Sequence, residues 1–185
     1  MNHFWLLPAL SGTFLLAWWW QRRTEDATAV DTIWSFALAG QAILYALVGD
    51  GDPWVRGAVG VLGGAWGLRL GWHLHQRSHG RGEDGRYAAL RERWGDGAQQ
   101  GFFWLYQLQA LVAWLFGAVF WAASGAGRDA PDAWWFAGIA VWLVAVGGEA
   151  LADKQLERCR RDESVDVCQS GLWRYSRHPN YFFEF

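Results

Sequence analysis

Cysteine and charge are both scarce in this chain of 185 residues, and each scarcity excludes a class of protein. Two cysteines are too few for a small domain that is held together by disulfides. Charged residues make up only 18% of the sequence and the formal net charge is -2, so nothing indicates a nucleic-acid partner. Hydrophobic residues make up 52%, which excludes an intrinsically disordered chain.

Tryptophan, by contrast, is abundant, with 16 residues in the chain. The mean hydropathy of -0.03 resembles that of a soluble domain. This average is misleading because tryptophan counts as polar on the hydropathy scale, although membrane proteins place it at both membrane interfaces. The composition therefore favours a membrane protein.

Long uncharged stretches alternate with clusters of charge, and this pattern predicts the fold class. A transmembrane helix needs about 20 mostly apolar residues. Five stretches meet this length once interfacial residues are included, and the start of a sixth helix follows near the C-terminus. We predict an all-α, multi-pass transmembrane bundle forming a single membrane domain, with spans at approximately 4–20, 32–49, 54–72, 102–124 and 133–152.

Basic residues lie mainly on one side of the predicted membrane. All but two of the 16 lysines and arginines fall between alternate pairs of spans or in the tail. The positive-inside rule therefore places the N-terminus outside and these segments in the cytoplasm. Arginine accounts for nearly all of the basic residues, which is typical of a GC-rich bacterium, so we expect a bacterial inner-membrane location. The predicted cytoplasmic loops are 21–31, 73–101 and 153–179.

The residue types that most often bind metals do not form a convincing site. Cys159 and Cys168 lie in the predicted cytoplasmic tail, where a reducing compartment would keep them as free thiols. Two cysteines alone make a poor zinc site. His75 and His79 have a chelating i, i+4 spacing, but the chain has no second cluster of this kind. We predict no metal centre.

Glycine recurs along the third predicted span at spacings that place small residues on one helix face. Such residues allow two helix backbones to approach closely. We expect close packing within one subunit, with a dimer face as the alternative. The glycines are Gly57, Gly60, Gly63, Gly64, Gly67 and Gly71.

Carboxylates at membrane depth are costly and are therefore candidates for function. Asp31 stands at the entry to the second span, and Glu149 lies near the end of the fifth. Asp153 follows Glu149 at i+4 on the same helix face, and Arg160 continues this face. For Glu149 we expect a buried partner or a cavity, whereas Asp153 by itself is also consistent with a solvated helix end.

The tail carries the strongest local signal, Gly-Leu-Trp-Arg-Tyr-Ser-Arg-His-Pro-Asn-Tyr-Phe-Phe-Glu at 171–184. Arg177 and His178 supply hydrogen-bond donors for phosphate or carboxylate. The proline that follows suits the first turn of a new helix. Asn180 and Glu184 then share one face of that helix. A ligand site is the more economical interpretation, and a basic patch for anionic lipid is the alternative.

This tail resembles the signature of a bacterial family of uncharacterised membrane proteins related to steroid 5-alpha-reductases. Its Arg-His-Pro-Asn-Tyr core is also similar to segments of sterol reductases and, in modified form, of isoprenylcysteine carboxyl methyltransferases. The resemblance covers almost the whole chain. Matching upstream segments are Val30-Asp31 with Trp34, Trp66-Gly-Leu-Arg69, Gly82-Glu-Asp-Gly-Arg-Tyr87, Arg91-Glu-Arg-Trp94 and Leu151-Ala-Asp153.

The resemblance implies an NADPH-dependent membrane reductase that acts on a lipophilic enone or another polarised double bond. Asp31 falls near the acidic residue that polarises the substrate in the steroid enzymes, and we predict it as the catalytic residue. The tyrosine partner of that acid aligns with Trp66, which cannot take its place as a proton donor. The cofactor-contacting positions implied by the resemblance are Glu149, Asp153, Arg160, Tyr175, Arg177, His178, Asn180 and Glu184.

Two alternatives to the reductase remain. An enzyme that uses S-adenosylmethionine, similar to isoprenylcysteine methyltransferases, shares the tail core. Members of the reductase family continue beyond this segment with further helices. We therefore expect a chain ending at Phe185 to lack one wall of the cofactor site. The second alternative is accordingly a non-catalytic membrane protein. Expected partners are membrane lipid and a lipophilic small molecule. The charged turn containing Glu83, Asp84, Arg86 and Tyr87 has no assigned role beyond ordering a loop.

Overall fold

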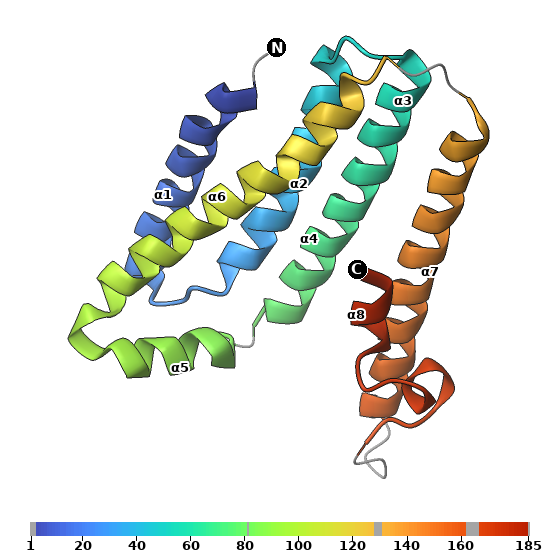
Figure 1. Cartoon of the computed structure of the whole chain (residues 1–185). Coiled ribbons are helices and arrows are strands. Elements are labelled where there is room, and N and C mark those ends of the chain that lie inside the picture. Colours follow the sequence, from blue (N-terminus) through green and yellow to red (C-terminus); the bar gives the residue numbers. More distant parts are fainter. Residues whose placement is uncertain (1–2, 81, 128–130, 162–166, 185) are drawn as a thin grey trace. The chain divides into compact units, whose positions relative to one another are not determined.

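The computed structural model of this chain describes residues 3–80, 82–127, 131–161 and 167–184, and within these ranges helices dominate (Figure 1). The chain divides into two compact units, Met1–Ala130 and Pro131–Phe185. The all-α prediction is confirmed for the described residues, which contain no strand.

The first unit contains helices at the first four predicted spans and a further helix, α5, that lies across one end of the bundle (Figure 1). The third predicted span is a continuous helical segment that changes to a π-helical turn in its middle. In chain order the elements are η1 (His3–Trp5), α1 (Leu6–Thr24), α2 (Ala29–Val48), α3 (Pro53–Ala58), the π-helical turn η2 (Val59–Gly63), α4 (Gly64–Ser78), α5 (Gly85–Trp94), η3 (Gly95–Gly97) and α6 (Ala98–Ser124).

Helix α2 is central to the first unit, since it packs against α1, α4 and α6. Its Val30 and Leu38 are fully buried beside Phe14 of α1 and Phe102 and Tyr106 of α6. Burial of apolar area of this kind is the main favourable term in helix packing outside a bilayer, and close van der Waals contact takes that role inside one. The core of the unit is therefore built around α2.

Glycine brings α2 and the third helical segment into close contact. A Cβ atom added at Gly67 would lie 2.9 Å from the Cβ and backbone nitrogen of Ala39 and from the carbonyl oxygen of Ser35. Gly60 and Gly63 face Ala46 and Ala42 of the same helix in the same way. The prediction of close packing within one subunit is confirmed.

Adding a methyl group at Gly67 is expected to force α2 and α4 apart, because two of the three nearest atoms belong to the backbone. We predict that Gly67→Ala lowers the free energy of unfolding by about 1–3 kcal/mol, the usual cost of overpacking. Gly57→Ala is the matched control, because nothing lies within 4 Å of a Cβ at that position. Thermal unfolding of the detergent-purified protein, followed by tryptophan fluorescence, measures both; equal midpoints would contradict the prediction.

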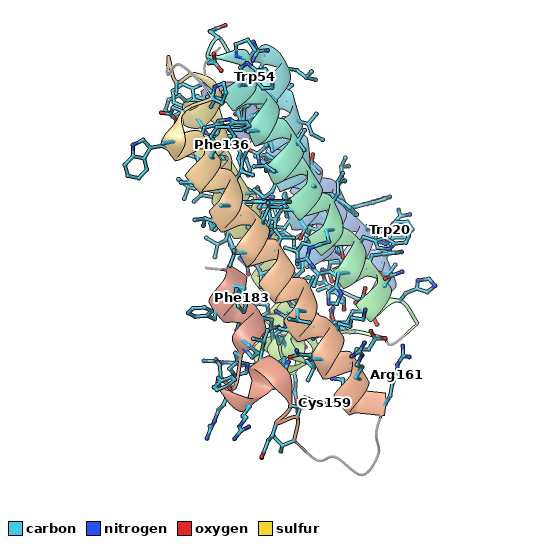
Figure 2. The ribbon with its side chains drawn as sticks, turned by 90° about the vertical axis from the view of Figure 1, so that its right-hand side faces the viewer. Trp20, Trp54, Phe136, Cys159, Arg161 and Phe183 are labelled. Carbon is cyan, nitrogen blue, oxygen red and sulfur yellow. A yellow bond between two sulfur atoms is a disulfide. The ribbon has the colours of Figure 1, made fainter. Side chains whose placement is uncertain are left out.

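The second unit is one long helix with the tail folded back along it. It consists of α7 (Ala133–Arg161), η4 (Gly171–Arg174) and α8 (Pro179–Glu184). Figure 2 shows Phe183 of α8 against α7, and a Cβ atom at Gly148 would overlap its ring. The predicted start of a sixth helix is thus α8, which is short and packs on α7.

Three of the helices are long and apolar enough to cross a membrane. They are α2, the helical stretch Gly85–Ser124 that contains α6, and α7. The first and third predicted spans are helical as expected, but their tryptophan, glycine and arginine residues keep their hydropathy lower. Large apolar side chains are exposed on all of these helices, among them Leu16, Leu47, Val61, Val119 and Val141.

Candidate functional site

Asp31 lies in the first turn of α2 and accepts hydrogen bonds through both carboxylate oxygens. The Tyr87 hydroxyl donates to Oδ1 over 2.8 Å, and Nη2 of Arg86 donates to Oδ2 over 2.8 Å. Tyr87 is buried, whereas the Asp31 side chain is 24% exposed. The predicted catalytic residue is therefore a partly accessible acceptor that is held by two donors from α5.

The charged turn before α5 brings these donors to α2. Asp84 caps α5 by accepting a hydrogen bond from the backbone N–H of Arg86 at 2.9 Å, and it also accepts from Nε of Arg86 at 3.0 Å. The backbone N–H of Asp84 in turn donates to Oγ1 of Thr28, just before α2 begins, over 2.8 Å. The turn is thus docked directly on the N-terminus of α2.

Glu83 fastens the same turn to α1 and α2. Its carboxylate accepts from the backbone N–H of Ala27 at 2.9 Å and from Arg91 at 2.7 and 3.0 Å. Arg91 also donates to Oε1 of the buried Gln21 on α1 over 3.2 Å. We call Glu83, Asp84, Arg86, Tyr87 and Arg91, with Asp31, the α2 dock. Its role, which the sequence left open, is to join α1, α2 and α5.

Charge and burial shift the pKa values of Asp84 and Tyr87 in the dock. Its turn and α5 lie in the predicted cytoplasmic loop, outside the spans. The hydrogen bond from Arg86 lowers the pKa of Asp84, so this carboxyl is ionised at neutral pH. Burial, with a smaller effect from the negative Asp31, raises the pKa of Tyr87 well above its usual range. Tyr87 therefore remains a neutral hydroxyl donor.

We predict that Glu83→Ala destabilises the first unit by about 1–3 kcal/mol, because it leaves the Ala27 N–H without its acceptor and leaves Arg91 only its hydrogen bond to Gln21. Glu92→Ala, next to Arg91 on α5, removes an exposed carboxylate and serves as the control. The thermal midpoint of each variant in detergent checks the difference. A midpoint for Glu83→Ala that matches the control would show that the dock does not support the fold.

The dock should also respond to acid. Because the pKa of Asp84 is lowered in the folded chain, its contact with Arg86 stabilises the protein above the ordinary aspartate pKa. That stabilisation is lost as the pH falls through the lowered value. Arg86→Gln should raise the Asp84 pKa toward its ordinary value and so remove this pH-dependent stabilisation, while Arg93→Gln should not. Titration of ¹³C-labelled aspartate carboxyls by NMR measures this, and an unchanged Asp84 pKa in Arg86→Gln would refute it.

In the second unit, Asn180 and Asp153 come together as the tail returns along α7. Nδ2 of Asn180 donates to Oδ1 of Asp153 over 3.3 Å. The other amide atom of Asn180, Oδ1, is buried and has no hydrogen-bond partner among the described residues. Glu149 lies one turn before Asp153 and is buried, as expected. These three predicted site residues form the polar end of the second unit.

The remaining predicted cofactor residues are exposed. The Tyr175 side chain is 85% exposed, and Arg160, Arg177 and His178 are exposed as well. The His178 ring stacks on that of Tyr181. The side chain of Glu184 lies outside the described residues. The structure therefore brings together Glu149, Asp153 and Asn180, whereas the other described members present their side chains to the surface.

The prediction of free thiols is wrong, because Cys159 and Cys168 form a disulfide. Cys159 lies near the end of α7, at the place labelled in Figure 2. The Cα atoms are 5.6 Å apart, within the usual range for disulfides. The prediction rested on the expected compartment alone, whereas the folding back of the tail decides which groups meet.

Two further contacts hold the returning tail. The backbone N–H of Leu172 donates to Oε1 of Gln155 over 2.8 Å, and the Trp173 indole N–H donates to the carbonyl of Ala152 over 2.8 Å. Both contacts lie near Asp153 on α7. Together with the disulfide, they hold the tail segment that leads to Asn180 against α7.

The family comparison covers nearly all of this architecture. Residues 17–185 match the model of a family described as a protein of unknown function, DUF1295. The chain belongs to the DUF1295 family. No curated protein and no solved structure matches it.

For this DUF1295 protein, sequence reasoning missed the partners of Asp31. The resemblance aligned the family's tyrosine partner with Trp66, which is partly buried and packs on the core. The hydroxyl next to Asp31 belongs to Tyr87. The many charged residues in the turn before α5 indicated that this turn contacts another part of the chain. No spacing in the sequence indicates which helix end it contacts.

Proposed function

We propose that this DUF1295 protein is a membrane reductase that uses NADPH to reduce a lipophilic enone or another polarised carbon–carbon double bond, as steroid 5-alpha-reductases do. The observation that carries the proposal is the hydrogen bonding of the Asn180 side-chain amide. Asp153 holds its Nδ2, while its buried Oδ1 has no partner among the described residues. A buried acceptor of this kind is costly unless a ligand supplies the donor. The carboxamide N–H of a nicotinamide is a donor that fits.

The other groups of the second unit suit the remaining parts of a dinucleotide. Asp153, and Glu149 one turn earlier, offer carboxylate acceptors for hydroxyl groups. The exposed Arg177 guanidinium is suited to a phosphate, with which arginine forms paired hydrogen bonds. Arg160, Tyr175, His178 and Glu184 follow from the family resemblance. The bound nicotinamide would supply the hydride, and the protein residues bind and orient it.

Asp31 has a positioning role in this proposal. Both of its oxygens accept hydrogen bonds from α5, so the carboxylate orients its neighbours instead of donating to a substrate carbonyl. Tyr87 stays a neutral hydroxyl because burial and Asp31 raise its pKa. The pair would form a fixed polar end to an otherwise apolar substrate site.

The proposal includes five membrane spans, with the N-terminus outside a bacterial inner membrane and the basic segments in the cytoplasm. The C-terminal end of α1 supports a membrane interface at this point. Arg23 lies over the Trp19 ring at 3.8 Å, and Arg22 lies near that of Trp18. Tryptophan and arginine side by side at a helix end are typical of a membrane interface. Membrane lipid would surround the chain, and the substrate would enter from it.

A comparison of two ligands tests the cofactor. NADPH should raise the thermal midpoint of the detergent-purified chain, because a ligand that binds only the folded state stabilises it. Asn180→Ala should weaken NADPH binding about tenfold, the effect of losing one hydrogen bond of about 1.4 kcal/mol. Lys154→Ala, exposed and adjacent to Asp153, should bind NADPH as the native chain does.

The same titration separates the enzyme classes. A midpoint that rises only with S-adenosylmethionine would overturn the reductase in favour of a methyltransferase. NADPH binding that is identical in Asn180→Ala and the native chain would refute the site. A chain that responds to neither ligand would contradict both enzyme classes.

A further inference from the structure

The tryptophans of this protein differ in what their indole N–H groups bind. Trp18 donates to the carbonyl oxygen of Gln99 over 3.0 Å, and Trp114 donates to that of His3 over 3.3 Å. Trp173 donates to the carbonyl of Ala152. The indole nitrogen of Trp34 is also buried, but it has no hydrogen-bond partner among the described residues. Trp34 is the one tryptophan in the described chain with this combination.

A buried N–H without a partner needs a physical reason. The indole group can only donate, so no rearrangement of its own ring satisfies it. Native proteins pair nearly all buried polar atoms, since each atom left alone loses its hydrogen bonds to water without replacement. The exceptions gather where a ligand or an ordered water supplies the missing partner.

The surroundings of Trp34 favour an organic ligand over water. Trp34 packs edge-on against Phe116 of α6 with ring centroids 5.6 Å apart, and it lies against the apolar core of the first unit. A buried water usually makes about three hydrogen bonds, and the Phe116 ring that Trp34 packs against offers it none. A ligand with an apolar body and one acceptor atom fits these surroundings better.

The charged groups next to Trp34 narrow the chemical class of the acceptor further. Asp31 lies one turn before Trp34 on the same face of α2. Its carboxylate is paired with Arg86, so this ion pair offers a negative group, such as a phosphate or a fatty-acid carboxylate, no net positive charge to bind. The remaining acceptor class is a neutral oxygen, of which the carbonyl is the strongest hydrogen-bond acceptor that an apolar lipid-like molecule commonly carries.

We propose that the indole N–H of Trp34 is the hydrogen-bond donor to the carbonyl oxygen of a lipophilic ligand that lies against Phe116, one helical turn from Asp31. This proposal deepens the reductase proposal. Any role of the carbonyl group in a reaction rests on the reductase proposal. There, Trp34 supplies the donor that Asp31 cannot, because both oxygens of Asp31 accept hydrogen bonds from α5.

The test uses two probes without NADPH, so it is independent of the cofactor. A decyl-substituted cyclohexenone and decylcyclohexene, which lacks the carbonyl, are titrated into the ¹⁵N-labelled chain in detergent micelles. The Trp34 indole signal is assigned by its absence in Trp34→Phe. It should move downfield with the enone and not with the alkene. The signals of Trp18, Trp114 and Trp173 should stay in place, because their N–H groups are already bonded.

Trp34→Phe keeps an aromatic ring beside Phe116 and removes only the N–H donor, so it should leave the fold intact. It should weaken enone binding about tenfold while leaving alkene binding unchanged. A Trp34 signal that does not move at saturating enone, or equal enone affinity in the two proteins, overturns the proposal. Failure of NADPH to bind overturns only the reductase, and a silent Trp34 in a chain that binds NADPH overturns only this inference.

Discussion

The docking of a charged turn on the N-terminus of α2 is the interaction on which the first unit depends. Glu83 and Asp84 bind the backbone N–H of Ala27 and the hydroxyl of Thr28 where α2 begins, and Arg91 extends the contact to Gln21 of α1. Opposite charges paired by hydrogen bonds in partly buried surroundings are stronger than exposed ion pairs, since solvent screens them less. One short segment thereby orders the ends of three helices.

The same contact determines the chemistry that α2 can present. With Tyr87 and Arg86 on its two oxygens, Asp31 acts as a fixed acceptor, and the polar group next along its face is the indole N–H of Trp34. The glycine face of α4 lies at backbone contact with Ser35 and Ala39, which begin one turn after Asp31 on α2.

Much of the fold follows from local pattern. The uncharged stretches predicted helices at all five places, since length and apolarity are properties of the segment itself. The glycine spacing predicted close packing for the same reason. Three of the five helices are apolar enough to span a membrane by composition; the other two carry tryptophan, glycine and arginine, so local hydropathy separates them less clearly.

Within the candidate site, the sequence by itself determined which residue types stand at which helical offsets: Glu149 one turn from Asp153, and an asparagine on the first turn of α8. Only the tertiary structure decided what they meet. The return of the tail along α7 pairs Asn180 with Asp153 and joins Cys159 to Cys168, against the thiols expected from the compartment. The tertiary structure likewise made Tyr87 the partner of Asp31. Such hydrogen bonds depend on the distances between segments that are far apart in the chain, and no local periodicity encodes those distances.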